Sequence, residues 1–581
     1  MKTCRLQPPS ASAGRGFALV TVLVFAGISL VALGGVMTWS SQSARMTARN
    51  IQYYNTLAAA EAATEKVLSR ISADYTGFGD ALVVANLASY RNMVPTVSEW
   101  SGWANYQFTD GQGSGSMTYA AGLNTWVYTN LASQYTGLQG LACTYRIISN
   151  ASAIGAPYQI PVGVRQEVQL ATVPIFQFAI FYSVELEINP GPNMTVSGRV
   201  HSNTNLFYSP GATLRFLSDV TAVGQILNQR QANDPSAPGG GTTSFSGRHD
   251  SGVSSLTLPI GTNNNPATVF SVIDLPPVGE DPASPMGKQR YYNKADMVVL
   301  VSDSTVTVTS GSFNSFATSI PWSQATSFIA TNASFYNKRE GKTVKATQID
   351  VAKLISWSAT NTTLRAALGG RDVSSIYVAD QRTQSNTTEP GVRVVNGQTL
   401  PSLGLTVASK NPVYVQGNYN APAAYLGTTN TTLTKPASLV GDAITVLSTA
   451  WNDANSSLAL SSRIAANTTV NAAFLGGIVP TAIYNGAKQY SGGVENYPRF
   501  LEDWSSRSLT YNGSMVVMFY SQTATGLWKG TGSTIGIYNP PTRNWAFDLN
   551  FMMGSKLPPC TPQMRVLIRA SWAMVAPNDV D

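Results

Sequence analysis

Charged residues are scarce in this sequence. Asp, Glu, Lys and Arg make up 12% of its 581 residues, about half the share of an average globular protein. The formal net charge is +7, and no run of lysine and arginine stands out. A nucleic-acid-binding surface needs a dense basic stripe, so the composition argues against nucleic acid as a partner. Ser, Thr, Asn and Gly replace the charges, which is typical of strands and turns that face water.

Histidine and cysteine are also few. There are two histidines, His201 and His249, and three cysteines, without any metal-type clustering. We therefore expect no metal and no cofactor. Cys4 lies near the start of the chain, which leaves Cys143 and Cys560. Outside the cytoplasm these two either form a disulfide or are two unrelated buried thiols, and the sequence leaves both possibilities open.

No group of residues predicts catalysis, so we expect that the protein is not an enzyme. Asp250 and Ser251 follow His249, but a Ser–His–Asp triad is assembled in space and not in sequence. We expect His201 to face solvent or to cap a turn.

The stretch ENYPRFLEDW, residues 495–504, contains two acids and an arginine that could suggest a glycoside hydrolase. The pattern fits an amphipathic helix better. Arg499 and Asp503 would form an ion pair one turn apart, and Phe500 and Trp504 would enter a β core.

One long apolar run lies near the start of the chain. Residues 17–39 contain no charged residue. A helix of that length rises about 35 Å, enough to span a hydrocarbon core of about 30 Å. The run is too long for a conventional signal peptide, whose apolar region has about 7–15 residues. Its length fits a signal anchor, but Arg15 and Gly16 directly abut Phe17, which a plain anchor does not explain.

The residues that follow predict a continuation of the same helix. Residues 38–75 contain no proline or glycine and are rich in helix formers. Ile51, Tyr54, Ala58, Ala62 and Val67 recur near helical spacing and predict the buried face. The glycines at 77 and 79 mark the expected end.

This start resembles the type IV pilin family. The similarity lies in the leader MKTCRLQPPSASAGRG, in RGFALVTVLVF, and in AAAEAA at 58–63. It is similar above all to PilX-type minor pilins and to the K-type minor pseudopilins of type II secretion. The resemblance implies that a prepilin peptidase cuts after Gly16 and methylates the new N-terminus, Phe17. It also implies that 17–71 packs with other pilins or pseudopilins in a filament.

One position departs from the family's pattern. Major pilins carry Glu at the fifth mature position, where it pairs with the terminal amine of a neighbouring subunit; here that position is Thr21. Thr21 supplies no charge. In the K-type pseudopilins the same loss accompanies a position at the filament tip, so the resemblance implies a tip or priming role.

The rest of the chain predicts an α+β fold that is mainly β. We expect a leader at 1–16, a pilin helix at 17–75, a small β head at 76–185 and a β-rich body at 186–581 with a flexible loop near 229–259. In the head, LACTYRIISNAS and VGVRQEVQLATV predict adjacent antiparallel strands. In the body, short strands separated by turn residues suggest the rungs of a parallel β-helix.

The resemblance thus implies a minor pilin-like subunit of a type IV pilus or related filament. It would be anchored in the bacterial inner membrane, with its body periplasmic or on the cell surface, for assembly priming or adhesion. The tryptophans and tyrosines would suit surface carbohydrate as a ligand. Two alternatives stay open: a membrane-anchored adhesin or polysaccharide-binding β-helix with no filament, and a β-helix lyase or hydrolase.

Overall fold

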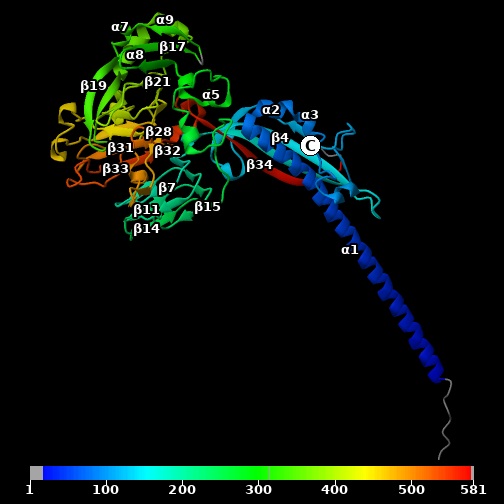
Figure 1. The fold of residues 1–581 in the computed structure, drawn as a ribbon. Coiled ribbons are helices and arrows are strands. Elements are labelled where there is room, and N and C mark those ends of the chain that lie inside the picture. The colour runs from blue at the N-terminus through cyan, green and yellow to red at the C-terminus, as the bar shows by residue number, and fades with distance from the viewer. Residues whose placement is uncertain (1–16, 313–314, 578–581) are drawn as a thin grey trace, which may run out of the picture.

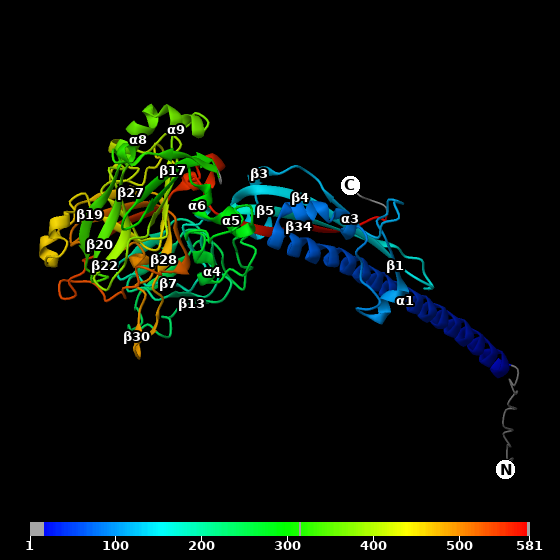
Figure 2. The same ribbon diagram turned by 45° about the horizontal axis from the view of Figure 1, so that its top comes forward.

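The computed structural model of the protein describes residues 17–312 and 315–577. It contains a long N-terminal helix, a small sheet packed on that helix, and a large body made mostly of strands (Figure 1). We call the small sheet with the helix segment packed on it the head. The free part of the helix points away from the body, which lies at the other end of the head (Figure 2).

The long helix, α1 (Phe17–Phe78), has 62 residues and is roughly 90 Å long. It ends where the sequence predicts, because Gly79 has a φ of 89° that most other residues avoid. Residues 17–51 are exposed throughout, whereas the later residues pack on the head sheet.

The packed face of α1 agrees with the expected one only in part. Val67 is buried as expected, but Ile51, Tyr54 and Ala58 are exposed and Ala62 is half-buried. The buried residues are Thr56, Ala59, Ala60, Ala63, Thr64, Val67, Leu68, Ile71, Asp74 and Tyr75. The small alanines let the helix approach Ala151 and Val164 of the sheet closely. Small residues therefore line the first part of the packed face, and the larger Val67, Leu68, Ile71 and Tyr75 line the part that follows.

The head sheet is antiparallel. Its order is β1-β4-β5-β34, and β2 and β3 also pair with β4. The predicted antiparallel pair is confirmed as β4 and β5. The bounds are β1 (Tyr106–Thr109), β2 (Tyr119–Gly122), β3 (Val127–Asn130), β4 (Gln139–Ala153), β5 (Val162–Pro174) and β34 (Gln563–Val575), with short helices α2 (Asp80–Ala85) and α3 (Leu87–Tyr90).

The last strand returns to the head. β34 pairs with β5 over its whole length, from Gln563 opposite Pro174 to Val575 opposite Gly163. The expected division assigned this strand to a body at 186–581. The pairing instead places the body as an insertion between two neighbouring strands of the head, because segments far apart in sequence become sheet neighbours.

The first part of the body is a set of short parallel strands, which we call the first stack. They form three parallel ladders in which partners are 20 residues apart, as Ile180, Val200 and Val220 are, except at β14 and β15, whose partners in β11 and β12 are 29 residues apart. The bounds are β6 (Ile180–Tyr182), β7 (Leu186–Ile188), β8 (Met194–Val196), β9 (Val200–Ser202), β10 (Leu206–Tyr208), β11 (Thr213–Phe216), β12 (Val220–Ala222), β13 (Ile226–Leu227), β14 (Thr242–Phe245) and β15 (His249–Ser251).

The segment 229–259, expected to be a flexible loop, contains two of these strands. β14 pairs with β11 and β15 pairs with β12, both in parallel. The Gly- and Pro-rich residues form a shorter connection that precedes β14. Beyond β15 the chain crosses to the far end of the body through α4 (Pro266–Phe270), α5 (Pro285–Gln289) and α6 (Tyr291–Lys294).

The second stack then runs back toward the first. Its strands pair in parallel in three sheets, with antiparallel additions at the far end. The bounds are β16 (Met297–Val301), β17 (Val306–Ser312), β18 (Ser315–Ile320), β19 (Ile329–Asn337), β20 (Lys342–Asp350), β21 (Ser375–Asp380), β22 (Thr388–Val395), β23 (Leu405–Ser409), β24 (Val413–Gln416), β25 (Ala437–Gly441), β26 (Ile444–Leu447), β27 (Thr468–Asn471), β28 (Ala473–Ile478), β31 (Ser508–Gly513), β32 (Met515–Tyr520) and β33 (Thr542–Phe547).

Three helices and a hairpin project from the second stack. The helices are α7 (Trp322–Ala325), α8 (Val351–Thr360) and α9 (Thr362–Ala367), and the hairpin is β29 (Ala482–Tyr484) with β30 (Ala487–Gln489). Asp350 and Asn361 cap α8 and α9 by accepting hydrogen bonds from backbone N–H groups. This agrees with the helical spacing of apolar residues in that segment.

The two stacks meet at one boundary, which we call the seam. In the described residues, only one of the three sheets continues across it, where β6 pairs with β32 and Ile180 lies opposite Met515. A buried column of register partners therefore crosses both stacks: Met297, Ile376, Val407, Leu439, Phe474, Met515, Ile180, Val200 and Val220. Along the other two faces, side chains join the stacks.

Candidate functional site

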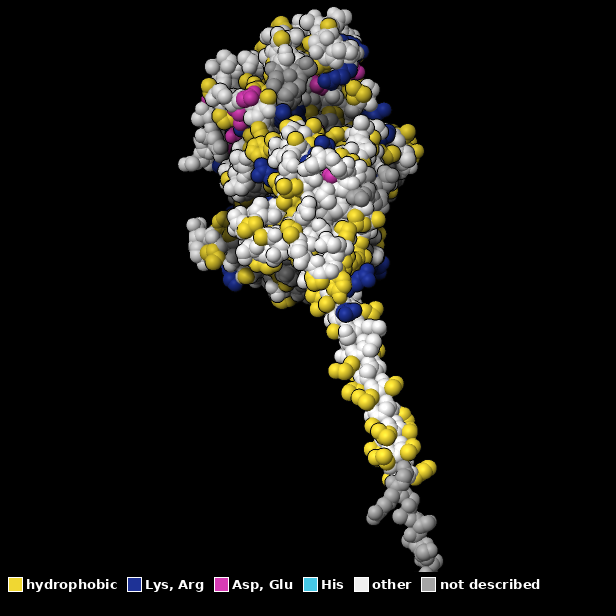
Figure 3. All heavy atoms as spheres, turned by 90° about the vertical axis from the view of Figure 1, so that its right-hand side faces the viewer, with side chains coloured by type: hydrophobic (Ala, Val, Ile, Leu, Met, Phe, Trp, Pro, Cys, Tyr) yellow, Lys and Arg dark blue, Asp and Glu magenta, His cyan; other side chains and the backbone are white. Residues whose placement is uncertain are grey.

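The first candidate site is the exposed apolar half of α1. Phe17, its first residue, is 81% exposed, and the large apolar side chains that follow it are exposed as well. Figure 3 shows hydrophobic side chains along the rod that α1 forms below the head. Among the described residues, α1 alone is a helix long and apolar enough to cross a membrane. Leaving so much apolar surface in water is costly, so this half requires lipid or protein around it.

The predicted processing and assembly residues lie at the tip of this helix. Gly16 lies outside the described residues. Thr21 is one turn after Phe17, and its Oγ1 donates a hydrogen bond to the Phe17 carbonyl at 2.8 Å. That bond satisfies the hydroxyl within the helix, so Thr21 presents no charge and no free donor to a neighbour.

The two cysteines that could form a disulfide are free thiols in this structure. Cys143 is buried in β4 of the head, and its Sγ donates to the Asn124 carbonyl at 2.9 Å. Cys560 lies in the connection before β34, with its Sγ 3.4 Å from the Lys294 carbonyl. Burial raises the pKa of both thiols, which keeps them protonated and unreactive near neutral pH.

The two histidines lie in different surroundings. His201 is buried, contrary to the expectation of a solvent-facing or turn-capping ring, and it contacts Thr221 Oγ1 at 2.8 Å and Asn203 Oδ1 at 3.0 Å. Burial lowers the pKa of His201 to about 4, so the ring stays neutral. His249 is exposed and stacks on Phe245.

Residues 495–504 are not the predicted helix. Only a short 3-10 turn, Val494–Asn496, is helical there. Arg499 pairs with Glu340 at 2.7 Å, and Asp503 accepts a hydrogen bond from Asn539, so the expected pair of Arg499 with Asp503 is wrong. The segment instead runs along the stack. Phe500 and Trp504 do enter the core as expected.

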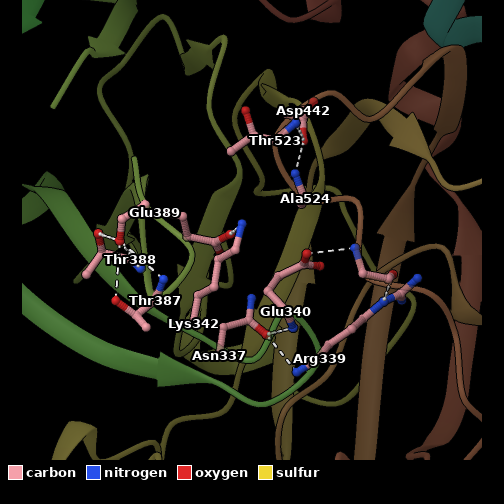
Figure 4. Close-up of polar contacts among 12 residues, drawn as sticks. Asn337, Arg339, Glu340, Lys342, Thr387, Thr388, Glu389, Asp442, Thr523 and Ala524 are labelled. Carbon is pink, nitrogen blue, oxygen red and sulfur yellow. Dashed lines mark hydrogen bonds and ion pairs between the residues drawn. The ribbon is translucent and has the colours of Figure 1, made fainter. Parts of the chain in front are cut away.

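A buried polar cluster surrounds Glu340 in the second stack (Figure 4). Glu340 accepts hydrogen bonds from Arg499 and from the Gly526 N–H, both at 2.7 Å. Asp442 accepts a 2.7 Å bond from the Ala524 N–H. Burial raises the pKa of Asp442, although bonds from backbone N–H groups act in the opposite direction. These carboxylates hold the loop 522–526 in place.

Glu389 lies in the same region and has weaker partners. Its Oε2 is 4.0 Å from Lys342 Nζ, and Tyr414 OH lies 3.5 Å from Oε1. Burial, with a smaller contribution from the Glu340 charge, raises the pKa of Glu389 to about 8. A carboxylic acid that stays neutral near pH 7 can serve catalysis. Glu389 is 1% exposed, however, so a substrate would have no access to it without a rearrangement.

The seam holds a second buried group of acids. Glu187 Oε1 accepts hydrogen bonds from Thr481 Oγ1 and, at 2.9 Å, from Ser491 Oγ. Glu495 accepts a 3.0 Å bond from Tyr490 OH and a 3.3 Å bond from the Asn189 N–H. The bonds to Glu187 and the bond from Asn189 to Glu495 connect the first stack to the second on a side where the described residues form no strand ladder.

The pairs Glu340–Arg499 and Glu187–Ser491 could not be found from the sequence. In each pair the two residues are more than 150 positions apart in the chain. In 17–312 and 315–577 no group of three or more His, Cys, Asp and Glu residues could hold a metal ion.

No protein-family profile and no curated protein sequence matches the chain. Among solved structures, the crystal structure of the competence-associated pilin ComZ from Thermus thermophilus is similar at 10% sequence identity and a TM-score of 0.30, covering 90% of this chain and 97% of that chain. A TM-score this low does not establish a common fold, so the proposals below rest on the residues and contacts of this chain.

Proposed function

We propose that the protein is a pilin-like, membrane-anchored subunit of a type IV pilus or related filament. The observation that carries this proposal is the division of α1. Residues 17–39 are exposed and apolar, residues 40–50 are exposed and mostly polar, and the later residues pack on an antiparallel sheet. Such a helix suits two successive environments, a bilayer before assembly and the packed helices of a filament core afterwards.

The proposal includes processing at the start of α1. A prepilin peptidase on the cytoplasmic side would cut after Gly16 and methylate Phe17. The cut would leave the whole of α1 intact, so the membrane anchor would be kept as the packing element of the filament.

The proposal places the protein at the filament tip. Two observations support this position. Thr21 offers no charge for the amine of a neighbour, and the large body would be difficult to repeat on every shaft subunit. A K-type pseudopilin or PilX-type role in priming or adhesion is the finer form of the same proposal, with other pilins as partners.

The body, in this proposal, is a parallel β-solenoid displayed on the periplasmic side or at the cell surface. The parallel ladders with partners 20 residues apart in the first stack support a solenoid. A membrane-anchored adhesin with the same solenoid and no filament is the second candidate, because α1 could serve as an anchor alone.

The test is mass spectrometry of the N-terminus of the protein from native membranes and from sheared filaments. We expect a chain that begins at N-methyl-Phe17. Gly16→Val should abolish the cut, and Gly14→Val in the same leader should leave it unchanged. A native chain that begins at Met1, or beyond the apolar run, would contradict pilin processing and favour the anchored adhesin.

A further inference from the structure

A hollow of about 280 Å³ lies on the flank of the second stack. It is built where the chain leaves the parallel ladders between β26 and β27. Asn452, Ser461 and Ser462 form an exposed polar rim, with Asn455 half-buried beside them. The volume is at the lower end of the range for small-molecule sites and suits a single sugar ring.

The floor of the hollow contains a buried cation and a buried carboxyl group. Arg463 and Glu502 are 3% and 1% exposed. Neither forms an ion pair with any side chain in the described ranges. Arg463 donates to backbone carbonyls, including that of Ile537 at 2.9 Å, and its Nε has no partner. A buried guanidinium N–H without an acceptor is costly.

These floor groups are held in fixed positions. Glu502 accepts bonds from the Ser448 N–H and from Ser448 Oγ, both at 2.6 Å. Trp451, also on the floor, donates from Nε1 to Asp453 Oδ1 at 2.8 Å, and Arg393 binds the other oxygen of Asp453 at 2.9 Å. A ligand would therefore meet a preorganised surface.

The charges and the shape indicate the class of ligand. One cation and one carboxyl group leave the floor with little net charge, which disfavours phosphate and other strong anions. A sugar hydroxyl both donates and accepts, so it matches the amides of Asn452 and Asn455 and the hydroxyls of Ser461 and Ser462 around the hollow. The exposed Ile464 and the ring of Trp451 supply apolar surface for the C–H groups of the ring.

We propose that this hollow, floored by Arg463, Glu502 and Trp451, binds a neutral hexopyranose, as a free sugar or as one residue of a glycan. The site goes beyond the filament role and does not depend on it, because a surface-anchored protein without a filament would present the same hollow.

The test uses the full chain in a detergent without a sugar headgroup. Saturation-transfer NMR and titration calorimetry would compare glucose, galactose and mannose with glucuronate and glucosamine. We expect at least one neutral hexose to bind with a Kd of the order of 1 mM, and to bind more tightly than either charged sugar.

Two matched variants locate the binding. Ser462→Phe places a ring on the rim and should weaken hexose binding about tenfold or more. Ser457→Phe adds the same ring at an exposed position that does not line the hollow and should leave binding within about twofold. Hydrogen exchange of β26 and β27 would show that both variants are folded.

Three results would overturn the proposal. They are the absence of binding by all three neutral hexoses, equal binding by Ser462→Phe and the native chain, and tighter binding of a charged sugar. None of these results bears on the N-terminal cut, so a failure here is distinguishable from a failure of the filament role.

Discussion

Two acids of the head and two acids at the seam of the body lie in different surroundings. In the head, Glu65 pairs with Arg569 through two bonds of 2.6 and 2.8 Å, and Glu167 pairs with Arg146, all near the surface. In the body, Glu187 and Glu495 are each 4% exposed, and no ion pair to either is found among the described residues.

The pKa directions follow this division. Burial raises the pKa of Glu65, but bonds from Arg569 and Gln166 outweigh it, so the net shift is downward. Burial raises the pKa of Glu187 to about 7, aided by the nearby Asp234 and Glu495 charges, while bonds from Thr481 and Ser491 oppose it. Glu65 is therefore favoured in its charged form, whereas Glu187 at the seam is favoured in its neutral form.

The largest expected effect on stability comes from replacing a buried tryptophan of the body, and an exposed tryptophan of the head serves as the comparison. Trp504 is fully buried in the body, whereas Trp100 in the head is 57% exposed. Trp504→Ala should lower the free energy of unfolding of the body by about 3–5 kcal/mol, and Trp100→Ala should change that of the head by no more than about 0.5 kcal/mol. Hydrogen-exchange mass spectrometry during denaturant titration would follow β31 and β5 separately. Equal losses in both regions would show that the head and the body unfold as one unit.

The pH dependence of the body is the next largest effect. An acid whose folded pKa is raised contributes stability below its unfolded pKa of about 4.5, and this contribution is lost as the pH rises through the folded pKa of about 7. The body should therefore be less stable at pH 8.5 than at pH 5. Glu187→Gln should recover on the order of 1–3 kcal/mol at pH 8.5 and little at pH 5.

The control for this prediction is Glu185→Gln, two residues earlier and only half-buried. It should leave the pH profile of unfolding unchanged. The measurement is the urea midpoint for unfolding of the body across pH 4.5–9. If the midpoint of the native body stays constant over that range, the raised pKa of Glu187 is contradicted.

A smaller effect of opposite sign is expected in the head. Because the pKa of Glu65 is lowered, its contribution is present above pH 4.5 and is lost as the pH falls through the folded value. The pair with Arg569 is partly exposed, so Arg569→Gln should cost only about 0.2–1 kcal/mol. The cost should shrink in high salt. Arg49→Gln, on the exposed part of α1, is the matched control, and a larger effect from it would contradict the assignment.

The smallest expected effect is that of a reducing agent. Because Cys143 and Cys560 are free, reduction should shift the melting temperature by less than about 1 °C. Peptide mapping without reduction would check this directly. A linked peptide containing Cys143 and Cys560 would show that head and body are covalently joined.

Much of the local structure could be predicted from the sequence. The length of α1 follows from an apolar run that continues into residues without proline or glycine, and Gly79 ends it. The strands β4 and β5 follow from alternation of apolar and polar residues. These features depend on neighbours in the chain, which is why a single sequence reveals them.

The contacts between distant segments could not be predicted. The face of α1 that packs depends on the sheet opposite it. Ala59 and Ala60 are therefore buried, whereas Tyr54, which was expected to be buried, is exposed. Residues 495–504 have a helical pattern, but the pairing of Arg499 with Glu340 holds them extended. The hollow above Arg463 and Glu502 likewise joins residues from separate turns of the chain, and no local motif marks it.

The return of β34 to the head has a consequence for synthesis. On the ribosome, α1 and β1–β5 emerge first, but β5 lacks its outer neighbour until residues 563–575 have been made. A chain that stops anywhere in the body would leave the edge of β5 unpaired and open to aggregation. The head sheet can therefore be completed only after the entire body has been translated. Truncated chains would expose the unpaired edge of β5, by which cellular quality control could recognise them.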